Sequence, residues 1–253
     1  MTRINMDELL KDGERIDEIG FGNLRLIQKP EDFCYGIDAV LLATFAEVKK
    51  GGRAVDFGTG TGIIPLILSH RTEAAELVGI EIQKDSYERG LRNIALNGLA
   101  DRVRLINSDV KELIKEKKLT PGSFDAVLSN PPYVSGNGGL KNKMAAKTIA
   151  RHETTAGLED FLKEASLLLK DRGDFYLVHR PNRLVDICTL SRKYKLEPKE
   201  MMFVCPNRMA APNILLLHCV KYGRPELKFL DPLFVYDEEG NYTEDIMKRY
   251  ERI

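Results

Sequence analysis

The chain has 253 residues, of which 43% are hydrophobic, and this length suits one large α/β domain with a full core. Its 38 basic and 38 acidic residues cancel, so any nucleic-acid surface must be a local patch. The first residues are polar, and no uncharged apolar run approaches membrane-spanning length. We therefore expect a cytoplasmic protein with no membrane partner.

The cysteines are widely spaced, and no two of them form a C-x-x-C pair. Reduced thiols at Cys34, Cys188, Cys205 and Cys219 fit this spacing better than a disulfide framework or a zinc site. His152 has no partner at metal-ligand spacing. We expect no metal in this protein.

The N-terminal region predicts a hairpin followed by a helix. Alternating runs at 15–19 and 24–28 flank a turn that contains two glycines, which is typical of a β-hairpin. Residues 38–48 read as a helix that ends at the glycine pair 51–52, with Asp38 at or near its N-cap.

From residue 53 onward, strand and helix patterns alternate. Strands are predicted at 54–57, 77–82, 103–106, 124–129, 175–178, 201–204 and 214–220. Helices are predicted at 63–69, 86–97, 110–117, 158–169 and 184–194. This alternation favours a three-layer α/β fold with helices on both faces of a mostly parallel sheet. Residues 205–213 are too few for a crossover helix, so the last two strands should pair antiparallel.

The pattern divides the chain into three parts. Residues 1–35 form a hairpin extension, residues 36–221 hold the α/β domain, and residues 222–253 form a tail. The tail contains a group of apolar residues from 230 to 236, so we expect it to pack back on the domain. A glycine- and lysine-rich stretch at 134–147 predicts a mobile loop.

Four polar features lie at the end of, or directly after, four successive predicted strands. They are Asp56, Glu81, Asp109 and Asn130. Ligands of open α/β sheets bind beyond the carboxyl ends of the strands, near a switch in strand order. Once the sheet folds, these side chains should line one edge and form a site there.

The glycine-rich turn after the first of these strands predicts a small-cofactor site. Gly58, Thr59, Gly60 and Gly62 belong to a G-x-G-x-G pattern that lets the backbone bend tightly and approach a ligand. Asp56 would repel a pyrophosphate, but it suits a ligand with an ammonium or sulfonium charge. S-adenosylmethionine carries both charges. An ordinary strand-to-helix turn remains the alternative.

Two further carboxylates fit the same cofactor. Glu81 is placed to accept both ribose hydroxyls, and Asp109 is placed to accept from the adenine amine. Each also has a structural interpretation, since Glu81 can cap the next helix and Asp109 can cap the segment at 110–117.

Asn130, Pro131, Pro132 and Tyr133 suit chemistry on a planar amino group. The nitrogen of such a group is a poor nucleophile, and two acceptors aimed at its protons draw it toward tetrahedral geometry. The Asn130 side-chain oxygen and the Pro131 carbonyl provide these acceptors, and the prolines preset the backbone. Tyr133 offers a face for stacking a base. The alternative is that the prolines simply end a strand.

A basic run follows this motif. Lys141, Lys143, Lys147 and Arg151 could form a lip that contacts RNA phosphates, or they could belong to a solvated loop.

These segments together resemble class I S-adenosylmethionine-dependent methyltransferases over about residues 36–221. More narrowly, the chain is similar to the tRNA (adenine-N6)-methyltransferase family that modifies the adenine beside the anticodon of a valine tRNA. The resemblance rests on residues 35–42 (YGIDAVLL), 55–62 (VDFGTGTG), 129–133 (SNPPY), 150–153 (ARHE) and 178–184 (VHRPNRL).

The resemblance implies a Rossmann-like sheet of seven strands with the last antiparallel, S-adenosylmethionine as cofactor, and Asp38 near that cofactor. It implies methyl transfer to adenine N6 in a tRNA partner. The Asn-Pro-Pro-Tyr motif is shared with guanine-N2 and protein glutamine-N5 methyltransferases, which remain alternatives. A catalytically silent RNA-binding module is the non-enzyme alternative.

Overall fold

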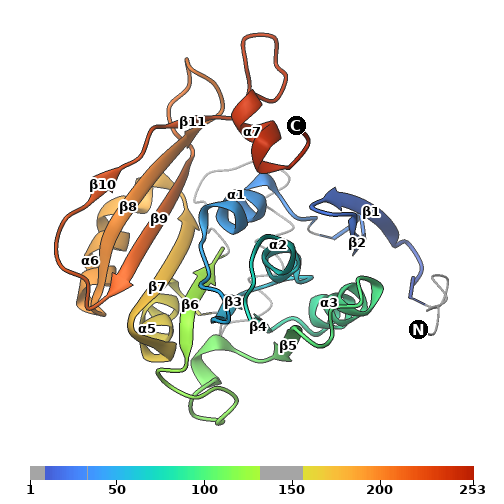
Figure 1. The fold of residues 1–253 in the computed structure, drawn as a ribbon, viewed down its shortest axis with the longest axis horizontal. Coiled ribbons are helices and arrows are strands. Elements are labelled where there is room, and N and C mark those ends of the chain that lie inside the picture. Colours follow the sequence, from blue (N-terminus) through green and yellow to red (C-terminus); the bar gives the residue numbers. More distant parts are fainter. Residues whose placement is uncertain (1–8, 33, 132–155) are drawn as a thin grey trace.

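One mixed sheet runs through the molecule, and helices cover both of its faces (Figure 1). The structure, a computed structural model, describes residues 9–32, 34–131 and 156–253. The strands lie in the order β10-β8-β9-β7-β6-β3-β4-β5, and β11 also pairs with β8. The predicted three-layer α/β fold is confirmed. None of the helices in the described ranges combines the length and the apolar character that crossing a bilayer requires.

The elements begin and end as follows. The strands of the main sheet are β3 (Arg53–Phe57), β4 (Glu76–Glu81), β5 (Val103–Asn107), β6 (Phe124–Ser129), β7 (Leu169–His179), β8 (Leu196–Cys205), β9 (Ile214–Lys221), β10 (Lys228–Phe229) and β11 (Leu233–Phe234). The helices are α1 (Ile37–Phe45), α2 (Ile63–Arg71), α3 (Lys84–Leu96), α5 (Leu158–Leu168), α6 (Leu184–Lys193) and α7 (Glu244–Arg249), with 3-10 turns η2 (Val110–Glu112) and η3 (Pro181–Arg183).

The direction of β9 sets the sheet apart from a purely parallel one. Strand β9 runs antiparallel to both β7 and β8, whereas β3 to β7 pair in parallel. The seven predicted strands therefore form the expected mixed sheet. The tail adds β10 and β11, which pair in parallel with short parts of β8.

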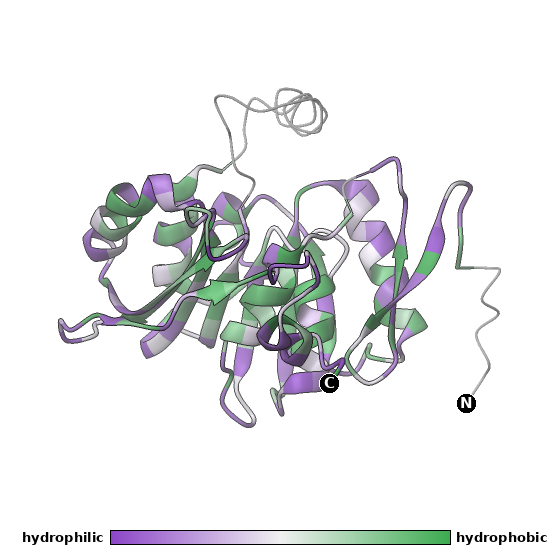
Figure 2. Ribbon diagram, turned by 90° about the horizontal axis from the view of Figure 1, so that it is seen from above, coloured by the Kyte–Doolittle hydropathy of each residue, from purple (hydrophilic) through white to green (hydrophobic). Residues whose placement is uncertain are grey.

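Two apolar clusters hold the layers together. One lies between the sheet and α1, α2, α3 and α7, and the other lies between the sheet and α5 and α6. Hydrophobic residues concentrate on the strands and on the helix faces toward them, while hydrophilic residues lie outside (Figure 2). Fully buried side chains such as Phe57, Leu66 and Phe175 each contribute about 1.5–3 kcal/mol through burial.

Four predicted elements differ from the structure. The first helix ends at Phe45, and Ala46 is already extended where the chain turns toward β3. The helix predicted at 110–117 is a single 3-10 turn, because the Leu113 carbonyl accepts from both Lys118 N–H and Leu119 N–H and closes the segment. Strands β7 and β8 are longer than predicted, and β8 includes Pro198 beside an irregularity in its pairing with β9.

The predicted N-terminal hairpin forms, with β1 (Arg15–Gly20) antiparallel to β2 (Leu24–Gln28). Helix α3 holds it by side chains that bond to the β2 backbone. Asn93 Oδ1 accepts from Ile27 N–H at 2.6 Å, and Asn97 Oδ1 accepts from Arg25 N–H at 2.9 Å. Asn93 Nδ2 also donates to the Thr61 carbonyl at 3.0 Å, so one fully buried amide joins the hairpin, α3 and the glycine turn.

We expect Asn93→Ala to lower the free energy of unfolding by about 2–4 kcal/mol, because buried backbone groups of Ile27 and Thr61 lose their partner. Chemical denaturation of the purified variant measures this change. Asn241→Ala, at an exposed position of the tail, should change it by less than about 0.5 kcal/mol. Equal losses in the two variants would contradict the structural role of Asn93.

Candidate functional site

The carboxyl ends of β4, β3 and β6 lie side by side at one edge of the sheet. Phe57, the last residue of β3, pairs with Ile80 of β4 on one side and with Ser129 of β6 on the other. Neighbouring strands are about 4.8 Å apart, so Gly58 and Asn130 leave the sheet from adjacent strand ends. The strand order reverses between β3 and β6, which is where open α/β sheets bind their ligands. The predicted convergence at this edge is confirmed.

The turn after β3 has the open backbone that the sequence predicts. Gly58, Gly60 and Gly62 have φ values of 69°, 57° and 87°, a region that favours glycine. The Gly62 N–H donates to the Thr59 carbonyl at 3.0 Å and closes the turn. A Cβ built on Gly58 or Gly60 would meet no described atom within 4 Å. Both glycines therefore face open space at the sheet edge.

Glu81 fixes this turn from the end of β4. Its Oε2 accepts from Gly60 N–H at 2.8 Å, and its Oε1 accepts from Gln83 N–H at 2.7 Å, at the N-cap of α3. The carboxylate is buried, and burial raises its pKa despite these hydrogen bonds. The capping role of Glu81 is thus present, and each oxygen retains a second lone pair for a ligand.

Asp56 carries the most unusual electrostatics of the site. It is 1% exposed, and neither carboxylate oxygen has a hydrogen-bond partner among the described residues. Burial raises the pKa of Asp56 to about 8, and the negative charge of Glu81 adds to this rise. The dipole of the neighbouring Thr59 hydroxyl favours the ionised carboxylate and opposes the rise. No basic side chain in the described ranges forms an ion pair with Asp56 or Glu81. Two buried carboxylates without a cation suit a positively charged ligand.

Asp109 and Asp38 flank this centre. Asp109 lies just past β5 and caps η2, because its Oδ1 accepts from Lys111 N–H at 2.9 Å. The capping interpretation of Asp109 is therefore confirmed. Asp38 lies in the first turn of α1, after Gly36 at the N-cap, and forms an ion pair with Arg180 at 3.5 Å.

The proposed amine-binding motif is described in part. Asn130 and Pro131 follow β6 directly, with Asn130 half-buried and Pro131 buried. Pro132 and Tyr133 lie outside the described residues. So do the basic residues Lys141, Lys143, Lys147 and Arg151, and the predicted mobile loop at 134–147.

His179 is a residue of this edge that the motif analysis did not single out. It ends β7 and is buried, and burial lowers its pKa to about 4, so the ring is neutral at physiological pH. Its Nδ1 accepts from Arg180 N–H at 2.8 Å. The segment 178–184 belongs to the resemblance described above, but only the assembled sheet shows that the His179 ring lies at this edge.

In the described part of the chain, no cluster of three His, Cys, Asp or Glu side chains could hold a metal.

Solved structures with the same fold define the class. A predicted O-methyltransferase from Agrobacterium tumefaciens matches with a TM-score of 0.69 at 22% identity, over 85% of this chain and 95% of that one. M. jannaschii TYW2, solved in complex with AdoMet, matches with a TM-score of 0.56 at 16% identity, over 83% and 86%. The fold is thus the Rossmann-like fold of methyltransferases.

The chain belongs to the methyltransferase small domain family, whose sequence profile matches residues 25–190. A relative from Parabacteroides distasonis, named tRNA1(Val) (adenine(37)-N6)-methyltransferase, is 31% identical over 72% of this chain and 74% of its own length. A Pasteurella multocida relative of the same name is 29% identical, over 84% and 86%. The predicted resemblance to this group of methyltransferases is confirmed.

We expect Asp56→Asn to raise the thermal midpoint of the ligand-free protein at pH 7.5. The folded state holds the Asp56 proton with a pKa of about 8, against about 3.8 in a model peptide, so raising the pH between these values destabilises the wild type. The neutral amide removes that loss, and the gain should shrink as the pH falls toward 4. Thermal melts from pH 4 to 8 measure the gain. A gain that does not depend on pH would contradict a raised pKa for Asp56.

Proposed function

We propose that this chain transfers a methyl group from S-adenosylmethionine to the exocyclic N6 of an adenine in tRNA. The observation that carries this proposal is the pairing of Phe57 with Ser129, which starts Asn130 beside the glycine turn. The names of the relatives support the tRNA substrate, since both act on adenine N6 of tRNA1(Val) by those names.

The residues at the edge fit S-adenosylmethionine chemically. Asp56, buried and without a partner among the described residues, would face the positive charges of the cofactor. Gly58 and Gly60 leave room for it, and Thr59 and Gly62 shape the turn. Glu81 would accept from the ribose hydroxyls, Asp109 from the adenine amine, and Asp38 would cover the cofactor. The bound cofactor supplies an electrophilic methyl group on a sulfonium sulfur.

The chain's own contribution to the reaction would lie in Asn130 and Pro131. Their two oxygens accept from the two protons of the adenine amine and concentrate electron density on its nitrogen. Pro132 and Tyr133 would complete the motif, with Tyr133 stacked on the base at about 1–3 kcal/mol. Asn130 is neutral and is no general base, so the proton released from the methylated nitrogen passes to water. A base from an unpaired loop costs less to extrude than one from a duplex.

Residues beyond the site belong to the same proposal. Residues 36–221 would form the methyltransferase domain, with 1–35 as a hairpin extension and 222–253 as a tail packed on the domain. The basic residues of 141–151 would contact RNA phosphates. A tRNA substrate would place the enzyme in the cytoplasm.

Nucleoside analysis tests the reaction directly. The purified protein is incubated with labelled S-adenosylmethionine and tRNA from cells that lack it, and the digested tRNA is analysed by mass spectrometry. We expect label in N6-methyladenosine. Label in N2-methylguanosine, or in glutamine when cell protein is offered as the acceptor, would replace the adenine assignment. RNA binding without any label would indicate a catalytically silent RNA-binding module.

In the same assay we expect Asn130→Ala to lower turnover by roughly 100–1000-fold, as removal of one preorganised hydrogen-bonding group does elsewhere. The affinity for S-adenosylmethionine, measured by calorimetry, should stay within about threefold, because Asn130 acts on the amine and not on the cofactor. Asn241→Ala on the exposed tail serves as the matched control. Near-wild-type turnover of Asn130→Ala would defeat the proposed role.

A further inference from the structure

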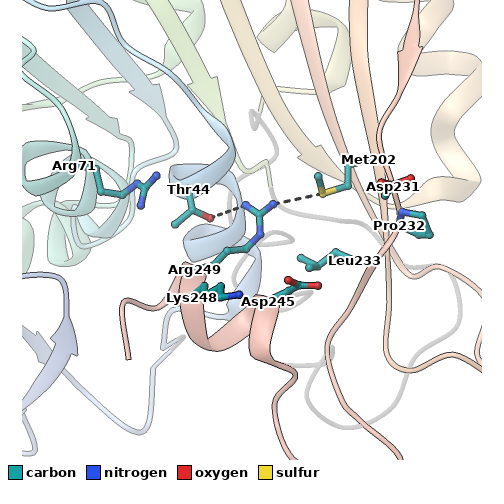
Figure 3. A pocket seen from close by; sticks show the side chains of 9 residues that line it. All are labelled: Thr44, Arg71, Met202, Asp231, Pro232, Leu233, Asp245, Lys248 and Arg249. Carbon is teal, nitrogen blue, oxygen red and sulfur yellow. Dashed lines mark hydrogen bonds between the residues drawn. The ribbon is translucent and has the colours of Figure 1, made fainter. Parts of the chain in front are cut away.

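A second pocket lies away from the catalytic edge, where the C-terminal tail returns to the sheet. It has a volume of about 400 Å³ and lies between α1, β8 and α7 (Figure 3). Met202, Pro232 and Leu233 give it an apolar wall. None of the residues assigned to the methyltransferase site lines it.

The guanidinium of Arg249 lies inside this pocket (Figure 3). It donates to Thr44 Oγ1 at 3.3 Å and to Met202 Sδ at 3.8 Å, and the sulfur is a weak acceptor. Among the described residues, no carboxylate forms an ion pair with it, not even Asp245 one turn earlier on α7. Burial and the nearby charge of Arg71 lower the pKa of Arg249, while the charge of Asp245 opposes this effect. Arg249 is half-buried, and a partly desolvated charge without an ion-pair partner is suited to an anion from outside.

Two further cations surround Arg249. Arg71 and Lys248 line the same pocket, and their own ion pairs are with Glu251 at 3.5 Å and Glu244 at 2.6 Å. Asp231 and Asp245 also line the pocket, so Arg249 is the cation of the lining that forms no ion pair within the described residues.

We propose that this pocket binds a phosphate group, with Arg249 as its main ligand and Arg71 and Lys248 beside it. The planar guanidinium offers paired N–H groups that match phosphate oxygens, and the apolar wall would contact the sugar or base attached to that phosphate. A backbone phosphate of the RNA substrate is the source that the proposed function supplies. Thr44 follows Asp38 on α1 by about 9 Å along the helix axis, so fewer than two helical turns separate the pocket from the residue proposed to cover the cofactor. The RNA source rests on the proposed function, whereas the phosphate site does not.

Phosphate binding is measured first, without methyl transfer. Thermal midpoints are recorded in sodium phosphate and in sodium chloride of equal ionic strength. Phosphate should raise the midpoint of the wild type. In Arg249→Gln, phosphate affinity should fall about 10–100-fold. Without phosphate, the thermal midpoint of this variant should be equal to or above that of the wild type, because a half-buried charge without an ion pair has been removed. Arg252→Gln, an exposed arginine on the same tail, should keep the wild-type response.

Equal phosphate responses in the wild type and Arg249→Gln, or no response in the wild type, would overturn the proposal. Lys248→Gln provides a second test, since Lys248 is exposed and its loss leaves the fold intact. We expect it to weaken phosphate binding about threefold to tenfold, and unchanged affinity would also count against the pocket.

Methylation kinetics then separate the two sources of phosphate. If the ligand is the tRNA backbone, Arg249→Gln raises KM for tRNA about tenfold with kcat unchanged. The slope of the logarithm of the binding constant against the logarithm of the salt concentration then falls by about one unit. If the ligand is a free phosphate compound, KM for tRNA is unchanged while the phosphate response is lost. Absence of methylation by the wild type would refute the proposed function and leave the phosphate measurement standing.

Discussion

The parallel pairing of β3 with β4 on one side and β6 on the other is the constraint on which the site depends. Because Phe57 is level with both Ile80 and Ser129, the glycine turn, Glu81 and Asn130 all start from one line across the sheet. A shift of one residue in either ladder would turn alternate side chains to the opposite face. The apolar cores on both faces prevent that shift, so packing far from the edge fixes the geometry of the edge.

Two ionisable side chains, Asp56 and Arg249, lack an ion pair among the described residues, and each lowers the stability of the folded chain. Asp56 is buried with no partner among the described residues, and the guanidinium of Arg249 has a hydroxyl and a sulfur for partners. By contrast, Glu14 near the hairpin is satisfied: hydrogen bonds from Arg92 and Arg89 outweigh the effect of burial and lower its pKa to about 2. Buried polar groups are ordinarily satisfied, so the unsatisfied carboxylate of Asp56 fits a position that a ligand would complete.

The sequence predicted the sheet and its edge well because those signals are local. Short apolar runs marked β3, β4 and β6, and the short link at 205–213 predicted the antiparallel β9. The length of β8 was not predictable, because Pro198 is tolerated beside an irregular pair that only the assembled sheet creates. The helix predicted at 110–117 was also wrong, because backbone hydrogen bonds to the Leu113 carbonyl close the chain there and helix propensity is a weak guide to such an end.

The second pocket and the role of Asn93 could not have been predicted from local pattern. Thr44, Arg71, Met202 and Arg249 are far apart in the chain, and no spacing rule connects them. An asparagine within a helical pattern is ordinarily an exposed polar residue, and its burial against a strand edge depends on how the hairpin docks.

The side-chain amide of Asn93 couples the N-terminal hairpin to the glycine turn. Because one side chain bonds to both Ile27 and Thr61, we expect the glycine turn and the first hairpin to open together. In such a cooperative unit of local unfolding, the slowest-exchanging amides of β2 and of the turn share one opening free energy. A ligand that tightens the turn would then also protect the hairpin from exchange.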